Sequence, residues 1–114
     1  DTPVSFDLLK AQGVVLGSGA IIVLNQERSL IKITESILTF FQHESCGKCV
    51  PCRVGTAKLL QMFGSVASEP SGYQAVLDKM LRQAEYMATT SLCPLGQSPI
   101  LPLKSLHRHF GTQL

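Results

Sequence analysis

The stretch Cys46-Gly-Lys-Cys49-Val-Pro-Cys52 holds three of the four cysteines of this 114-residue chain, at two successive C-x2-C spacings. The fourth cysteine, Cys93, lies far along the chain and is followed by Pro94. Three thiolates in one turn and a remote Cys-Pro are a ligand pattern of iron–sulfur clusters. The clustering favours a metal site over the spread-out disulfides of a secreted domain, and therefore a reducing, cytoplasmic compartment.

The same cysteines have two other interpretations. C-x2-C pairs also hold zinc, so a zinc-stapled structural or interaction module without a redox role is the main alternative. A thiol switch that cycles between dithiol and disulfide is the weaker one. A third cysteine so soon after the second fits a [4Fe-4S] cubane better than two separated zinc pairs. We therefore expect Cys46, Cys49, Cys52 and Cys93 to bind one [4Fe-4S] cluster.

The residues around the triplet suit an anionic cluster. Gly47 and Gly55 lack a Cβ, so we expect their backbone to approach the cluster sulfurs closely. Lys48, Arg53 and the N-terminus of the following helix are expected to offset the negative charge of the cluster and to tune its reduction potential.

Downstream of the N-terminal region, apolar side chains recur at helical spacing in four stretches, over residues 29–45, 53–67, 73–90 and 98–111. Pro51 suits the start of the second, a turn over residues 68–72 separates the second from the third, and Ser98-Pro99 opens the fourth. We expect Gly111 to end that helix in the left-handed conformation. Short connections between amphipathic helices imply antiparallel neighbours, so the predicted fold is mainly α and resembles a four-helix bundle.

The chain changes character near residue 27. Ala20-Ile-Ile-Val-Leu24 lies between Gly17-Ser-Gly19 and Asn25 and predicts a buried strand between turns. Because Gly17-Ser-Gly19 precedes a strand and opens no helix, it is interpreted as a β-turn and not as a phosphate loop. A lone strand is unstable, so residues 1–27 are expected to end a β-domain whose other strands lie before Asp1 or in a partner chain. Residues 28–114 would form the helical metal-binding domain.

Composition excludes several functions. Hydrophobic residues make up 45% of the chain and the net charge is only +2, with basic residues scattered along the sequence. This argues for a folded core and against nucleic acid as a partner. The longest aliphatic run, residues 20–24, is far too short for membrane insertion. No nucleophile with an adjacent base is visible, so we expect no catalytic site in the chain. Histidines 43, 107 and 109 are interpreted as helix-end residues and methionines 62, 80 and 87 as core residues.

Glu44-Ser-Cys-Gly-Lys-Cys-Val-Pro-Cys-Arg-Val-Gly-Thr56 and Ser91-Leu-Cys-Pro-Leu-Gly96 resemble the C-terminal part of the NADH-binding flavoprotein subunit of respiratory complex I. Asp1-Thr-Pro and residues 16–23 are similar to the end of that family's β-grasp (SLBB) domain, and His107-Arg-His-Phe110 is similar to its last helix. The diaphorase subunits of NAD(P)-linked hydrogenases and formate dehydrogenases share this architecture.

The resemblance implies a role in electron transfer. In the family, FMN in the preceding domain takes hydride from NAD(P)H and passes single electrons to a [4Fe-4S] cluster, whose ligands match the four cysteines here. The cluster then feeds iron–sulfur centres in partner subunits of a multi-subunit oxidoreductase, in the cytoplasm or peripheral to a membrane complex. The glycine-rich loops that bind flavin and nicotinamide are not in these residues, so FMN and NAD(P)H are implied for the preceding domain only.

Overall fold

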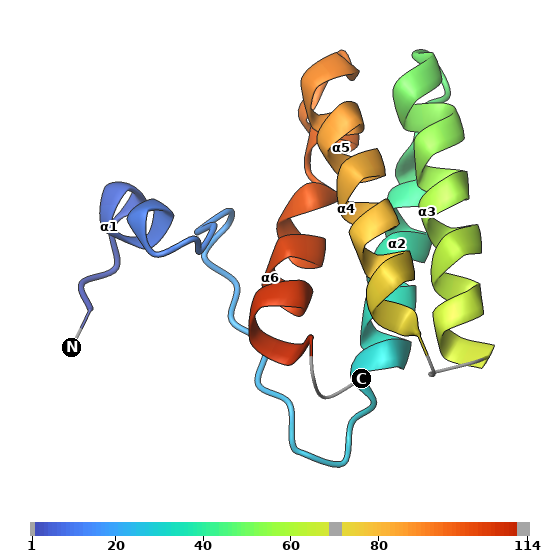
Figure 1. Ribbon diagram of the computed structural model, residues 1–114. Coiled ribbons are helices and arrows are strands. Elements are labelled where there is room, and N and C mark those ends of the chain that lie inside the picture. Colours follow the sequence, from blue (N-terminus) through green and yellow to red (C-terminus); the bar gives the residue numbers. More distant parts are fainter. Residues whose placement is uncertain (1, 69–71, 112–114) are drawn as a thin grey trace.

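The computed structural model describes residues 2–68 and 72–111, and within these ranges the regular structure is entirely helical. The helices are α1 (Phe6–Ala11), α2 (Leu30–Glu44), α3 (Val50–Ser68), α4 (Tyr73–Thr90), α5 (Pro94–Gln97) and α6 (Ile100–Phe110). The four long helices α2, α3, α4 and α6 run antiparallel to their neighbours in the chain, and α1 lies to one side of them on an irregular segment (Figure 1). The predicted helical bundle is therefore confirmed.

Helix α4 is the centre of the bundle, since it packs against both α3 and α6, while α2 covers α3. The core is formed by apolar side chains that recur at helical spacing on the inner faces of these helices. They are Leu38, Leu59, Phe63, Val66, Leu77, Met80, Ala84, Met87, Ile100, Leu103 and Leu106. Burial of each large side chain contributes about 1.5–3 kcal/mol relative to exposure, so the bundle has a substantial core of its own.

The residues next to each end of α2 determine where this helix begins and ends. The Ser29 hydroxyl accepts a hydrogen bond from the Lys32 amide at 3.4 Å and caps the first turn, and Ser45 closes the last. Helix α3 begins at Val50, with Pro51 in its first turn, where the missing amide costs nothing. The turn predicted over residues 68–72 lies largely outside the described residues.

The strand predicted over residues 20–24 is not formed. This segment is irregular, and the side chains of Ile21, Ile22 and Val23 are between 81% and 89% exposed. A strand needs a neighbour to take up its backbone hydrogen bonds, and residues 2–68 and 72–111 provide none. The turn before it is confirmed, because the Gly19 amide donates to the Leu16 carbonyl at 2.8 Å.

Two further details differ from the predictions. Gly111 has φ −59°, so α6 does not end in the left-handed conformation. Ser98 ends the short helix α5 and does not cap α6: its hydroxyl donates to the Pro94 carbonyl at 2.6 Å, within a turn that the sequence pattern did not predict. None of the helices in the described ranges is long and apolar enough to cross a bilayer.

Candidate metal centre

The fold brings the two cysteine-bearing segments to the same end of the bundle. Cys46 and Cys49 lie in the loop between α2 and α3, Cys52 lies in the first turn of α3, and Cys93 immediately precedes α5. The start of α3 and the end of α4 lie side by side at this end (Figure 1). Cys52 is buried, Cys49 is half-buried, and Cys46 and Cys93 are exposed.

The loop that carries the first two cysteines is held against α3 by hydrogen bonds from both the side chain and the backbone amide of Arg53. Gly47 has φ +74°, a left-handed conformation that glycine adopts without strain. Its carbonyl accepts a hydrogen bond from Arg53 Nη1 at 2.5 Å, and its amide donates to the Ser45 hydroxyl at 3.4 Å. The Arg53 amide in turn donates to the Cys49 carbonyl at 3.0 Å. Arg53 therefore positions the loop as well as adding positive charge beside it.

Cys52 is the buried anchor of the site. Its Sγ lies 3.3 Å from the Ser45 hydroxyl, and its carbonyl accepts a hydrogen bond from Thr56 Oγ1 at 2.8 Å. Gly96 in α5 packs directly over it, since a Cβ built on Gly96 would lie 2.9 Å from the Cys52 Cβ and 2.5 Å from Ser91 Oγ. A larger residue would force α5 away from α3, so this glycine sets the distance between Cys52 and the segment that bears Cys93.

The thiol of Cys49 links the loop to that same segment. The backbone amides of Leu92, the residue before Cys93, and of Cys52 favour the thiolate form of Cys49. They lower the pKa of Cys49 below the usual value, with the Arg53 charge as a smaller contribution. A cysteine with a stabilised thiolate is a better metal ligand, because the thiolate is the form that binds.

The four thiols lie at the same end of the bundle but do not surround a single point. Within residues 2–68 and 72–111, no three Cys, His, Asp or Glu side chains are close enough to hold a single metal ion.

A buried hydroxyl beside these cysteines has no acceptor. Ser91 is 6% exposed, and its Oγ has no hydrogen-bond partner among the described residues, although its carbonyl accepts from Gln97 Nε2 at 2.9 Å. Buried polar groups are almost always paired, so an orphan next to Gly96 and Cys52 indicates a missing acceptor. Cluster and thiolate sulfurs are such acceptors, and the residues present fit a [4Fe-4S] group.

Gly55 lies where α3 packs on α4. It makes room for the buried side chain of Met87, whose Cγ would lie 2.7 Å from a Cβ at Gly55, so this glycine serves the packing of α3 on α4.

The histidines and methionines lie where the sequence predicts. His43 is exposed and lies 3.1 Å from the Glu44 carboxylate, at the end of α2. His107 lies 3.6 Å from Asp78, in the last turn of α6, where His109 also lies. Met80 and Met87 are fully buried in the core, and Met62 packs against it. None of these residues is needed to complete the set of four cysteines.

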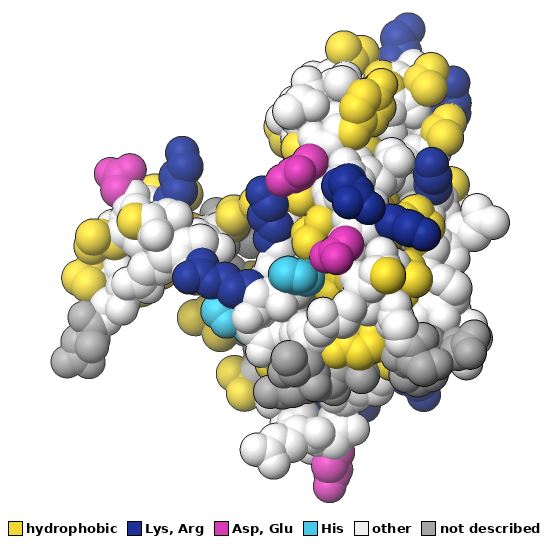
Figure 2. Space-filling view, in the orientation of Figure 1, with side chains coloured by type: hydrophobic (Ala, Val, Ile, Leu, Met, Phe, Trp, Pro, Cys, Tyr) yellow, Lys and Arg dark blue, Asp and Glu magenta, His cyan; other side chains and the backbone are white. Residues whose placement is uncertain are grey.

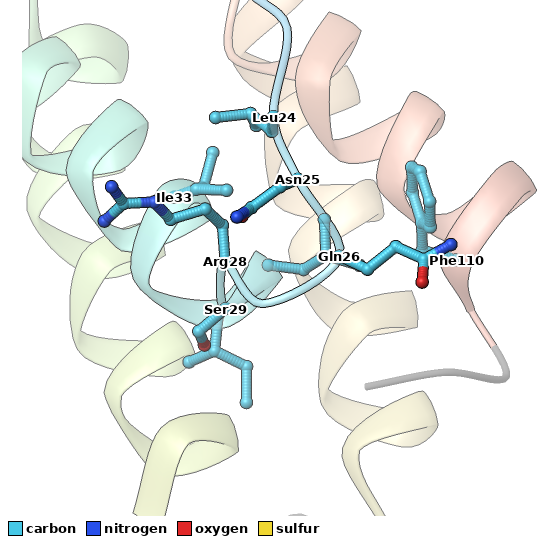
Figure 3. Close-up of a pocket in the computed structure, with 9 residues that line it drawn as sticks. Leu24, Asn25, Gln26, Arg28, Ser29, Ile33 and Phe110 are labelled. Atoms are coloured by element: carbon cyan, nitrogen blue, oxygen red, sulfur yellow. The ribbon is translucent and has the colours of Figure 1, made fainter.

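A depression at the other end of the bundle is separate from this site. It lies between the segment before α2 and the end of α6, and Figure 3 shows Leu24, Asn25 and Phe110 among the side chains around it. No cysteine lines it.

The family model described as the NADH-ubiquinone oxidoreductase-F iron-sulfur binding region matches residues 32–114. The chain belongs to this family. As a member of the iron-sulfur binding region, it is a [4Fe-4S] domain with a role in electron transfer. Membership confirms the resemblance seen in the cysteine motif and favours the cluster over the zinc and thiol-switch alternatives.

Similar proteins cover nearly the whole chain. It is 29% identical to the NADP-reducing hydrogenase subunit HndC of Solidesulfovibrio fructosivorans, over 99% of the chain and 23% of that protein. It is 31% identical to an NADH-quinone oxidoreductase subunit of Rickettsia bellii, over 96% of the chain and 26% of that protein. The corresponding protein of Rickettsia rickettsii is 30% identical, over 100% of the chain and 27% of its own length. The chain thus spans about a quarter of the length of these relatives.

Proposed function

We propose that Cys46, Cys49, Cys52 and Cys93 together hold one [4Fe-4S] cluster that relays electrons. The observation that carries the proposal is that the fold gathers all four cysteines of the chain at one end of the bundle, although they come from two distant segments. The close approach of Gly96 to Cys52 holds these two segments together.

The chain's own residues would hold and tune the cluster. The Ser45 hydroxyl lies 3.3 Å from the Cys52 sulfur, and the amides of Leu92 and Cys52 favour the thiolate of Cys49. Hydrogen bonds to cluster sulfurs disperse negative charge and raise the reduction potential, as do nearby cations such as Arg53. The cluster supplies one-electron transfer when bound.

The wider role follows from the relatives. They are named as subunits of an NADH-quinone oxidoreductase and of an NADP-reducing hydrogenase, and they are about four times as long as this chain. We infer that the cluster passes electrons between FMN, reduced by NAD(P)H in a preceding domain, and iron–sulfur centres in partner subunits. The complex would be an NADH dehydrogenase, hydrogenase or formate dehydrogenase in a reducing, cytoplasmic compartment. Residues 1–27 would then belong to the end of the preceding domain, and residues 28–114 to the cluster domain.

Replacement of Cys93 tests the ligand set. In protein purified without oxygen, Cys93→Ala should lose the EPR signal of the reduced cluster, or convert it to that of a cluster with fewer irons. Leu92→Ala is the matched control, because it alters the neighbouring exposed side chain and keeps the amide that favours the Cys49 thiolate. Full iron content and an unchanged spectrum in Cys93→Ala would remove Cys93 from the ligand set.

A further inference from the structure

A groove between α3 and α4 gathers basic side chains on the flank of the bundle. We call it the basic groove, and it is lined by Lys58, Met62, Lys79, Arg82, Gln83 and Tyr86. Figure 2 shows dark-blue Lys and Arg side chains close together on this face. Lys79 and Arg82 lie one helical turn apart on α4, and the packing of α3 against α4 brings Lys58 to the same groove.

The charges of α4 are divided between its two sides. Its acidic residues turn toward α6, where Asp78 lies 3.6 Å from His107 and Glu85 lies 3.2 Å from Lys104. Its basic residues Lys79 and Arg82 line the groove on the side of α3, and α3 has no acidic residue in its sequence. Glu85 is thus paired with Lys104, and no ion pair with Lys58, Lys79 or Arg82 occurs in the described parts of the chain.

The groove also offers apolar contact. Met62 is half-buried between the cations, and Tyr86 is 59% exposed at the edge of the groove. Tyrosine, methionine and arginine are enriched at protein interfaces, because each offers a large contact area at modest entropic cost. Three cations beside an exposed aromatic ring and a thioether are complementary to a segment that carries both carboxylates and apolar side chains.

We propose that the basic groove is a docking site for an acidic segment of a partner protein. A phosphate-bearing ligand fits less well, since the cations come from the middle of two helices, where no free backbone amides are available to bind one anion. Nucleic acid fits less well too, because proteins that bind it contact many phosphates, roughly 6–10. The groove lies on the side of the bundle, away from the cysteine end, so docking there is an assembly contact independent of the cluster.

Zero-length crosslinking tests the proposal in the assembled complex. A carbodiimide joins a lysine amine to a carboxylate only where the two are in contact, and mass spectrometry then identifies both. The expected result is a crosslink from Lys58 or Lys79 to an Asp- or Glu-rich segment of another subunit, with Lys10 in α1 as the exposed lysine for comparison. The proposal would be overturned if Lys58 and Lys79 gave no crosslink and were acetylated in the complex as fast as Lys10.

A binding measurement separates specific docking from general charge. The probe is a labelled peptide of alternating Glu and Leu, with a Gln-for-Glu peptide as its neutral counterpart, and the protein is the complete subunit with its cluster. The triple variant Lys58→Gln, Lys79→Gln, Arg82→Gln should weaken binding by roughly tenfold, from about 0.5 kcal/mol for each exposed pair. The matched triple Lys10→Gln, Arg28→Gln, Lys32→Gln removes the same charge elsewhere and should leave binding within about twofold. The proposal would be overturned if the two triple variants lost the same affinity for the Glu-Leu peptide. It would also be overturned if inorganic phosphate displaced the labelled peptide as well as the unlabelled peptide does.

Discussion

Gly96→Ala should loosen the contact that holds α5 against α3. The added methyl group would lie 2.5 Å from Ser91 Oγ, 2.7 Å from Ser91 Cβ and 2.9 Å from the Cys52 Cβ. Both neighbours are buried, so neither side chain can move aside cheaply. Overpacking of this kind costs about 1–3 kcal/mol. Because Cys93 immediately precedes α5, the displacement should also move it relative to Cys52 and lower the iron content of the purified protein.

Gly64→Ala is the control for this substitution. Nothing lies within 4 Å of a Cβ at Gly64, which lies in α3, so that variant should gain about 0.5–1 kcal/mol from helix propensity alone. At about 4 °C per kcal/mol for a domain of this size, Gly96→Ala should unfold at least about 6 °C below Gly64→Ala. Equal melting temperatures and equal iron contents in the two variants would refute the account of how α5 is positioned.

Four further substitutions or titrations probe the same region. Gly55→Ala should lower the melting temperature relative to Gly64→Ala, because a Cβ there would meet a fully buried methionine side chain, and thermal unfolding checks this. Arg53→Met should leave the iron content of the protein unchanged but lower the reduction potential of the cluster in a redox titration, because a nearby cation is lost. An unchanged potential would show that Arg53 has a structural role only. The pKa of Cys49 is lowered in the folded chain, so its alkylation in metal-free protein should reach its midpoint at a lower pH than in the denatured chain. By the same linkage, Cys49 stabilises the metal-free fold at pH above its unfolded pKa, and the effect is lost as the pH falls through its folded pKa. Ser91→Ala should stabilise the metal-free protein by about 1 kcal/mol in thermal unfolding, yet lower the potential of the cluster if the hydroxyl donates to sulfur.

The helices could be predicted because their causes are local. The apolar spacing, the Ser29 cap and Pro51 lie within the helices that they define, so α2, α3 and α4 occur close to the expected residues. The strand at residues 20–24 could not be judged in this way, because a strand depends on a neighbour that the residues themselves do not specify. Helix α1 was missed, and its signals are the Ser5 hydroxyl that caps it and Asp7 in its first turn.

The sequence predicts the four cysteines of the candidate site but not the residues that position them. The cysteine spacing marks the four residues directly, whereas the contact of Gly96 with Cys52 and the orphan hydroxyl of Ser91 arise only when α5 packs on α3. The same holds for the basic groove, because Lys58 and Arg82 come from different helices. Contacts between distant segments follow from packing geometry, which has no signature in a single stretch of sequence.

Metal analysis of the anaerobically purified protein tests the central claim most directly. Iron, sulfide and zinc would be measured per chain, with EPR spectra recorded before and after reduction by dithionite. The account predicts about four irons and four sulfides, no stoichiometric zinc, and an EPR signal that appears on reduction. One zinc per chain and no signal, in protein produced with iron available, would contradict it.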